Sequence, residues 1–133
     1  MTSTLEYLGK LSVKAIHTRS QSKIVSDAPV DNKGKGANFS PTDYVATSLA
    51  SCMLTIMGIK CNEKALNMVG AKASVEKIMA SDPRRISEIN IQIEMPSNID
   101  HKNRKILEAA ALNCPVAKSL HPDIVQNVNF EWK

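Results

Sequence analysis

Residues 40–52 decide the fold of this chain, and they read SPTDYVATSLASC. Ser40 is a good N-cap residue, and Pro41 suits the first helical position, where its missing N–H costs no hydrogen bond. Asp43 stands three residues after Ser40, so the two side chains can form a capping box. We therefore predict a helix that begins at Pro41 and runs to about Leu66.

This helix is predicted to be apolar nearly all round. Apolar residues recur at helical spacing on one face, and others occupy the remaining faces. The first set is Val45, Leu49, Cys52, Ile56 and Ile59, and the second is Met53, Leu54 and Met57. A helix that is apolar on all sides is surrounded by protein. Because the sheet of so small a chain does not cover it, we infer a second subunit.

Alternating apolar and polar residues predict strands on both sides of this helix. The region between Asp27 and Asn38 has almost no aliphatic residues and is predicted to be a loop. Asp100 is predicted to cap the second helix. The predicted strands cover 4–19 (with a turn at Gly9 or Lys10), 23–26, 71–80, 86–95 and 125–132, and the further helices cover 101–113 and 115–120. The main order, β-β-α-β-β-α-α-β, predicts an α+β fold.

Length and composition predict one globular domain over residues 1–133. Hydrophobic residues make up 43% of the chain and charged residues 23%, as in ordinary soluble proteins. The formal net charge of +4 is spread along the chain. The densest basic groups, Arg84-Arg85 and Lys102 to Lys105, have no aromatic residues between them, so we expect no nucleic-acid partner.

The sequence also predicts the surroundings of the protein. Lys60 and Glu63 interrupt the longest apolar run before it reaches the roughly 20 residues that span a bilayer, so we expect no membrane partner. Residues 1–6 contain no basic segment followed by an apolar one, which argues against a secretory signal. The expected location is the cytoplasm.

Three cysteines carry the chemistry that the sequence offers. Their spacing forms no CxxC pair and no His stands at a zinc-ligand interval, so neither a metal nor another cofactor is predicted. Cys52 is either a small core residue or a nucleophile. Cys114 precedes Pro115 at a predicted helix start, where unpaired N–H groups favour a thiolate. Cys61 lies about 13.5 Å further along the helix and half a turn out of phase with Cys52, so the two cannot bond.

Two motifs together resemble one family. Residues 40–53, followed about 60 residues later by CPVAKSL at 114–120, resemble the OsmC/Ohr family of small bacterial thiol peroxidases (osmotically induced protein C and organic hydroperoxide resistance protein). The resemblance covers nearly the whole chain in the order of its elements and points to an OsmC-like branch. It implies an intertwined homodimer with β-sheets packed around two long central helices and with active sites at the interface.

The resemblance also implies roles for three residues. Cys52 would be the peroxidatic cysteine, Cys114 the resolving cysteine, and Arg19 the cation that stabilises the Cys52 thiolate. Such a cation is needed because burial alone raises the pKa of a thiol, and only the thiolate attacks a peroxide. A solvent-facing arginine in a turn is the alternative for Arg19. His17, beside it, is expected on a surface strand.

The chain departs from the family pattern at one position. Organic hydroperoxide resistance proteins carry a glutamate ten residues before the peroxidatic cysteine, and this position is Thr42 here. Asp43 matches an acidic position that is common in OsmC-like branches, although it is also the acid of the predicted capping box. We therefore predict that Asp43 and Thr42 are supporting residues. If Thr42 does not orient Arg19 as the glutamate would, we expect weaker peroxidase activity or a different substrate.

Two functions from different classes remain after this reading, besides a purely structural domain. The first is a thiol-dependent peroxidase for organic hydroperoxides, with hydrogen peroxide as an open second substrate. A dithiol such as a lipoyl protein or a thioredoxin-like protein would reduce it. The alternative is an OsmC-like redox-responsive protein with weak or different thiol activity that acts as a binding or stress-response module.

Overall fold

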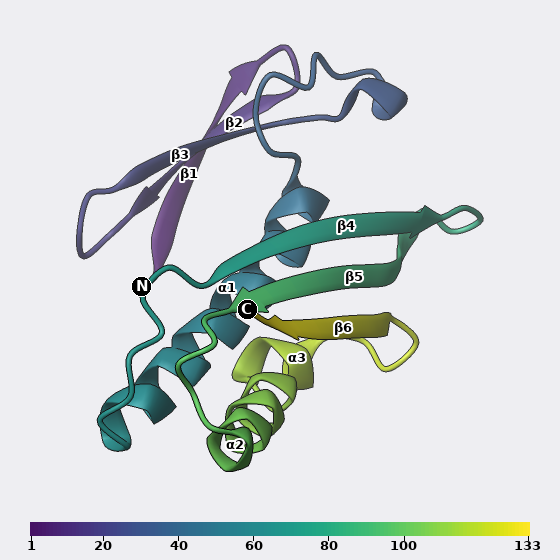
Figure 1. Cartoon of the computed structure of the whole chain (residues 1–133). Helices are drawn as coiled ribbons and strands as arrows, with labels where there is room; N and C mark the ends of the chain where they lie inside the picture. The colour runs from purple at the N-terminus through teal and green to yellow at the C-terminus, as the bar shows by residue number, and fades with distance from the viewer. The chain divides into compact units, whose positions relative to one another are not determined.

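The computed structural model describes all residues from Met1 to Lys133. The elements follow in the order β1, β2, β3, η1, α1, β4, β5, α2, α3 and β6 (Figure 1). The chain divides into two compact units, Met1–Val45 and Ala46–Lys133. These elements confirm the predicted α+β class, and the single domain over residues 1–133 stays a prediction.

The first unit is built on a three-stranded antiparallel sheet in the order β1-β2-β3. The predicted region 4–19 is a hairpin of β1 (Ser3–Gly9) and β2 (Ser12–His17). Its turn is formed by Lys10 and Leu11, so the predicted turn falls at Lys10, and Gly9 is the last residue of β1. Gly9 has a φ of +89°, which favours glycine. β3 (Lys23–Asp27) completes the sheet, and the loop that follows contains one 3₁₀ turn, η1 (Val30–Asn32).

Helix α1 (Pro41–Glu63) begins as the sequence predicts. The Asp43 N–H donates to Ser40 Oγ over 3.1 Å, and the Ser40 N–H donates to Asp43 Oδ2 over 3.0 Å, which completes the capping box. The helix ends three residues earlier than predicted. Ala65 takes a left-handed backbone with a φ of 53°, and the Leu66 N–H bonds to the Cys61 carbonyl, which stops the helix before Leu66.

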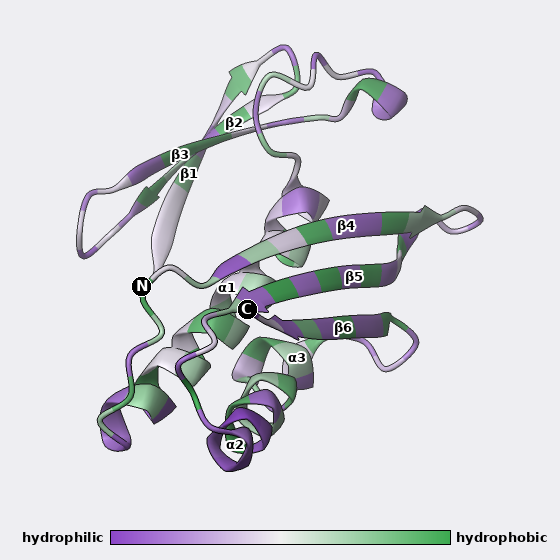
Figure 2. Ribbon diagram, viewed as in Figure 1, coloured by the Kyte–Doolittle hydropathy of each residue, from purple (hydrophilic) through white to green (hydrophobic).

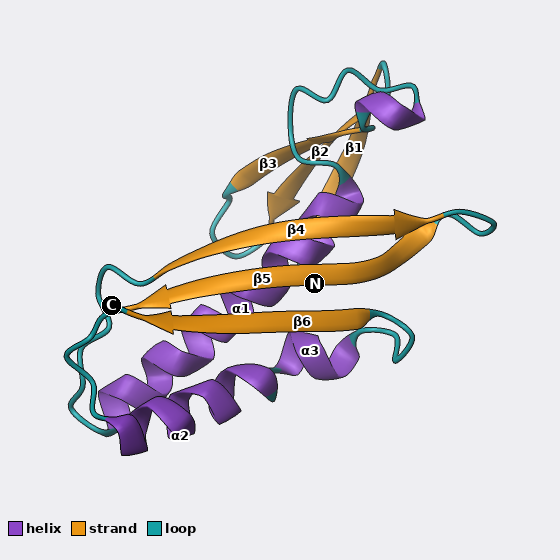
Figure 3. Ribbon diagram, turned by 45° about the vertical axis from the view of Figure 1, so that its right-hand side comes forward, coloured by secondary structure: helices purple, strands orange, loops and turns teal.

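The second unit contains a mixed sheet in the order β4-β5-β6. β4 (Lys72–Ala80) and β5 (Arg85–Met95) are antiparallel, whereas β5 and β6 (Val125–Trp132) are parallel. Helices α2 (His101–Leu112) and α3 (Pro115–Ser119) form the crossover connection that a parallel pair requires. Both lie on one face of the sheet, as Figures 1 and 3 show from two directions.

The core of the second unit lies between this sheet and the helices. On β5 the buried residues alternate with partly exposed polar ones, and Figure 2 shows the same alternation along the strands. Ser87 is an extra residue that has no pair on β4, which shifts the buried face by one position after Ile86. The buried apolar side chains of α1, β5 and α2 include Leu49, Met53, Met57, Ile89, Ile93 and Leu107.

One prediction about a helix cap needs correction. Asp100 occupies the N-cap position of α2, but its carboxylate makes no capping bond to the helix backbone. It instead accepts a hydrogen bond of 2.7 Å from the side-chain amide of Asn103. Arg104 and Trp132 tie this helix to the sheet, with the guanidinium 5.1 Å from the indole ring centre.

Helix α1 is long and apolar, and a third of its most apolar window is buried within the chain. Its buried residues, from Ala46 to Cys61, recur at helical spacing and form one stripe, whereas Ile59 is 50% exposed. By length and composition alone, this helix could cross a membrane. The prediction that Lys60 and Glu63 make the apolar run too short to span a bilayer is therefore not supported. A core helix that other protein covers has the same properties.

Candidate active site

The two cysteines of the quoted motifs meet in the second unit. Cys52 lies on α1 and is partly exposed, while Cys114 lies between α2 and α3 and is fully buried. The Cys52 thiol interacts with the Cys114 thiol, and both cysteines are reduced. The structure therefore brings together the two thiols that the resemblance pairs.

Cys114 holds its position because it is the N-cap of α3. Its sulfur accepts a hydrogen bond of 3.4 Å from the Ala117 N–H, and Pro115 occupies the first helical position. Gln126 of β6 donates to the Ala117 carbonyl over 3.1 Å, which links α3 to the sheet. The sequence predicts this cap, but only the tertiary structure shows that the sulfur is closed off from solvent.

Burial decides the ionisation of the Cys114 thiol. Desolvation raises the pKa of this thiol, and the neighbouring Cys52 raises it further. The N–H groups of Ala117 and Val116 act in the opposite direction and lower the pKa less than burial raises it. The prediction that this helix start favours a thiolate is therefore outweighed, and the neutral thiol is the dominant form near pH 7.

Cys61 stands apart from this pair. It is 1% exposed on the buried stripe of α1, and burial raises the pKa of its thiol. A buried thiol with a raised pKa behaves as a small apolar residue. Its role as a spectator stays a prediction.

Arg19 lies in the first unit, at the turn between β2 and β3. Its side chain is exposed. Hydrogen bonds frame the turn, since the Gln21 N–H bonds to the His17 carbonyl over 2.7 Å and His17 Nδ1 lies 2.6 Å from Ser20 Oγ. Because Arg19 and the two cysteines belong to different units, the role of Arg19 stays a prediction.

Thr42 and Asp43 lie in the first turn of α1. The carboxylate of Asp43 is engaged in the capping box, and the Thr42 hydroxyl lies 3.3 Å from Ser40 Oγ. Both residues therefore have a part in starting the helix. These contacts do not involve the two cysteines, so the supporting role of Thr42 and Asp43 at the thiol site stays a prediction.

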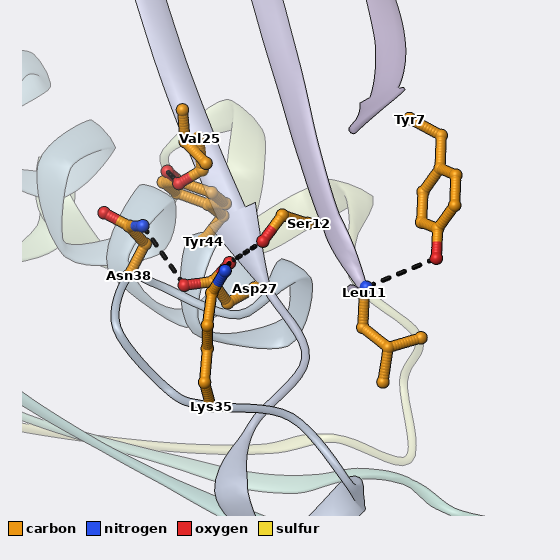
Figure 4. Close-up of polar contacts among 8 residues, drawn as sticks. All are labelled: Tyr7, Leu11, Ser12, Val25, Asp27, Lys35, Asn38 and Tyr44. Carbon is orange, nitrogen blue, oxygen red and sulfur yellow. Dashed lines mark hydrogen bonds and ion pairs between the residues drawn. The ribbon is translucent and has the colours of Figure 1, made fainter. Parts of the chain in front are cut away.

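The sequence analysis missed a buried carboxylate in the first unit. Asp27 is 1% exposed, and its carboxylate accepts hydrogen bonds from the Ser12 hydroxyl and the Asn38 amide (Figure 4). Lys35 Nζ lies 3.9 Å from Asp27 Oδ1. The hydrogen bond from Ser12 lowers the pKa of Asp27 even though burial opposes it.

Asp27 organises the loop that leads into α1. The Asp27 N–H bonds to the Phe39 carbonyl, directly before the capping residue Ser40. Within the loop, a Cβ at Gly34 would overlap the Ala28 carbonyl, so only glycine fits there. Burial is what distinguishes this aspartate from an ordinary loop residue, and no local pattern in the sequence reveals it.

The outer face of the β4-β5-β6 sheet is polar and shallowly hollowed. The hollow has a volume of about 780 Å³. Amide side chains bond across the strands, from Asn127 to Asn90 over 2.8 Å and from Asn129 to Gln92 over 2.7 Å. This face carries neither a cysteine nor a histidine, and we assign no chemistry to it.

The protein thus combines an α+β fold with two neighbouring thiols, one on a long helix and one at the N-cap of a short helix. The family model for OsmC-like protein matches residues 34–129, a range that includes both cysteines. The chain therefore belongs to the OsmC-like family.

Solved structures agree with this assignment. A candidate osmotic-stress-induced and detoxification response protein from Psychrobacter arcticus is 53% identical, with a TM-score of 0.95 over 98% of this chain and 96% of that chain. No curated protein shows significant similarity.

Two more distant structures share the fold. The organic hydroperoxide resistance protein OsmC of Legionella pneumophila is 14% identical, with a TM-score of 0.73 over 98% of this chain and 97% of that chain. The organic hydroperoxide resistance protein OhrB of Bacillus subtilis is 15% identical, with a TM-score of 0.61 over 100% of this chain and 98% of that chain. At these identities the likeness concerns the fold alone.

Proposed function

We propose that this protein is a thiol-dependent peroxidase that reduces organic hydroperoxides in a stress or detoxification response. The observation that carries the proposal is that the Cys52 and Cys114 thiols are neighbours and interact. Membership of the OsmC-like family supports it, as does the name of the Psychrobacter arcticus relative. Within one chain Cys52 is the less buried of the two thiols, which suits a first reaction at Cys52.

The proposed chemistry needs two sulfur atoms and no cofactor. The Cys52 thiolate attacks the terminal oxygen of the hydroperoxide, the O–O bond breaks, and the alcohol leaves with a proton. Cys52 is then a sulfenic acid. The Cys114 thiol gives up its proton and the thiolate attacks the Cys52 sulfur, which forms a disulfide and releases hydroxide, and the hydroxide takes up a proton to leave as water. A dithiol restores both thiols and becomes a disulfide itself.

Arg19, Thr42 and Asp43 have supporting roles in this proposal. A guanidinium beside Cys52 would stabilise its thiolate by charge, and Arg19 has an exposed side chain that is available for this role. Asp43 and Thr42 would act indirectly, through the start of the helix that carries Cys52. Replacing Arg19 by alanine is expected to raise the pKa of the Cys52 thiol and so to slow its oxidation, and each unit of that rise would amount to about 1.4 kcal/mol.

We also propose a homodimer with α1 at its centre. The long apolar helix supports this, since only a third of its most apolar window is buried within one chain and the rest is left for a second subunit to cover. The sheet of the first unit exposes further apolar side chains, including Leu5 and Tyr7 at 67% and 64%. Patches of this kind mark interaction surfaces.

The test is consumption of cumene hydroperoxide with dithiothreitol as reductant. We expect turnover in the wild type, none in Cys52→Ser, and unchanged turnover in the matched control Cys61→Ser. Without the reductant, Cys114→Ser is expected to consume a single equivalent and then remain as a sulfenic acid. Equal rates in the wild type and Cys52→Ser would refute the proposal.

Thr42 favours the second candidate, a redox-responsive protein with weak thiol activity. In this case the missing carboxylate limits Arg19. Thr42→Glu would then raise the rate of Cys52 oxidation, measured in single turnover with cumene hydroperoxide. An unchanged rate would remove the threonine as the reason for weak activity.

A further inference from the structure

The inward-facing side chains of β6 are apolar with one exception. The partly buried residues of this strand alternate with exposed ones, and they are Gln126, Val128, Phe130 and Trp132. Gln126 is in register with Ile89 of β5, which is 0% exposed, so both side chains lie on the core face of the sheet. A polar group on a core face needs a hydrogen-bond partner, which an apolar side chain there would not need.

The partner of Gln126 is the short helix that begins after Cys114. Gln126 Nε2 donates to the Ala117 carbonyl over 3.1 Å, which joins β6 to α3, and Figures 1 and 3 both show this helix beside the strand. Ala117 also donates its own N–H to the Cys114 sulfur over 3.4 Å. One residue of α3 is therefore bonded on one side to the sheet and on the other side to the buried thiol.

A helix as short as α3 does not hold this arrangement by itself. It has five residues, Pro115–Ser119, whereas isolated helices shorter than about 12 residues are marginal in water. Its turn is closed by the Lys118 N–H and the Cys114 carbonyl over 3.1 Å. Such a turn opens readily unless another element holds it, and Gln126 provides a bond from the sheet.

We infer that Gln126 is a positioning residue of the thiol pair, which holds α3 so that the Cys114 sulfur stays beside that of Cys52. All three residues belong to the unit Ala46–Lys133, and the two thiols interact there. Because α3 is already ordered in the reduced protein, disulfide formation does not have to order it. This inference rests on the proposed function for the role of the disulfide.

The test measures how stable the disulfide is in the wild type and in Gln126→Met. Methionine is unbranched and of similar size, but it has no N–H donor for the Ala117 carbonyl. Each protein is equilibrated without oxygen in mixtures of reduced and oxidised dithiothreitol. When the S–S bond forms, each cysteine gives up one proton and one electron, and the oxidised dithiothreitol takes up both pairs and becomes a dithiol.

Mass spectrometry counts the disulfide in the equilibrated samples. Acid stops the exchange, N-ethylmaleimide blocks the free thiols, and trypsin then cuts the chain. Cys52 falls in residues 36–60, Cys114 in residues 106–118, and Cys61 in a separate peptide, 61–64. The link between the first two peptides therefore reports the Cys52–Cys114 disulfide alone.

In Gln126→Met the disulfide has to order α3 as it forms. We expect an equilibrium constant for disulfide formation about fivefold smaller, which raises the reduction potential of the pair by about 20 mV. The matched control is Gln92→Met, since the Gln92 amide bonds on the outer face of the sheet, to Asn129 over 2.7 Å and to Glu131 over 3.3 Å. Its potential should equal that of the wild type.

A purely structural role of Gln126 would give a different result. Gln126→Met would then unfold at a lower urea concentration but keep the wild-type potential, and this outcome would overturn the inference. An equal shift of the potential in Gln92→Met would also overturn it, because the effect would not be specific to the bond with α3.

Amide hydrogen exchange tests the same bond without a disulfide. In the reduced Gln126→Met protein the Lys118 N–H should exchange about fivefold faster or more. The Arg104 N–H, which bonds to the Asp100 carbonyl over 3.0 Å in the first turn of α2, should keep its rate. An unchanged rate at Lys118 would contradict the inference.

The outcomes separate this inference from the proposed function. A shifted potential in Gln126→Met without hydroperoxide turnover in the wild type would refute the peroxidase and leave the inference standing. Turnover in the wild type with equal potentials in both proteins would do the reverse. A wild type that forms no Cys52–Cys114 disulfide would refute both.

Discussion

The thiol of Cys52 lies close enough to that of Cys114 to interact with it, although two strands and a helix separate them in the chain. One is partly exposed, and the other is buried and caps a helix of five residues. This pairing places a reachable sulfur next to a protected one. In the proposed peroxidase mechanism Cys52 would react first and Cys114 second, and this difference in burial is consistent with that order.

Disulfide formation after peroxide oxidation should accelerate as the pH rises. Burial raises the pKa of the Cys114 thiol above its ordinary value of 9.0, so below that pH the thiolate fraction grows about tenfold per pH unit. Trapping of the Cys52 sulfenic acid with dimedone should therefore be efficient at pH 6 and poor at pH 9. A sulfenic acid lifetime that does not change with pH would contradict this prediction.

Ser40→Ala should destabilise the protein through the start of α1. The substitution removes the acceptor for the Asp43 N–H and one half of the capping box, which costs about 1 kcal/mol of the free energy of unfolding. Urea unfolding followed by circular dichroism measures this loss. Asp43→Asn keeps an oxygen for the Ser40 N–H and should cost less, and a larger loss in Asp43→Asn than in Ser40→Ala would be the contrary result.

Asp27→Asn should lower the melting temperature near pH 7 and weaken the acid sensitivity of stability. The Ser12 hydroxyl lowers the pKa of Asp27 below the unfolded value of 3.8. Its carboxylate therefore contributes stability above about pH 4, and this contribution is lost as the pH falls through the lowered pKa.

The control for this aspartate is Asp100→Asn. The carboxylate of Asp100 also has a lowered pKa, through its bond from Asn103, but the residue is exposed. Thermal melts between pH 2 and 7 should show the larger change for Asp27→Asn. Identical profiles for the two variants would mean that the buried network around Asp27 does not stabilise the loop.

Ile59→Asp should dissociate the proposed dimer. Ile59 is half exposed on α1 within one chain, and a charge there would be buried at a central helix interface without a partner. Sedimentation velocity at micromolar concentration should show a dimer for the wild type and monomers for this variant. Val69→Asp, at an 88% exposed loop position, is the control and should remain dimeric. A monomeric wild type would exclude the dimer.

The sequence by itself determined the elements and their ends wherever the signal was local. The capping box at Ser40 and Asp43, the turn at Lys10 and the alternation along β5 depend on neighbouring residues, so their pattern could be read directly. Cys114 at the start of α3 is a signal of the same kind. The extra residue Ser87 and the early end of α1 at Glu63 were missed, because backbone detail of one or two residues leaves little trace in composition.

Only the tertiary structure decided what depends on burial and on contacts between distant segments. It placed Cys52 against Cys114, a pairing for which the residues alone offered no geometric proof. It showed that desolvation outweighs the N–H groups of α3 at Cys114, and that Asp27 is a buried network centre. Desolvation and long-range contact arise from the packing of elements far apart in the chain, and no single stretch of sequence encodes them.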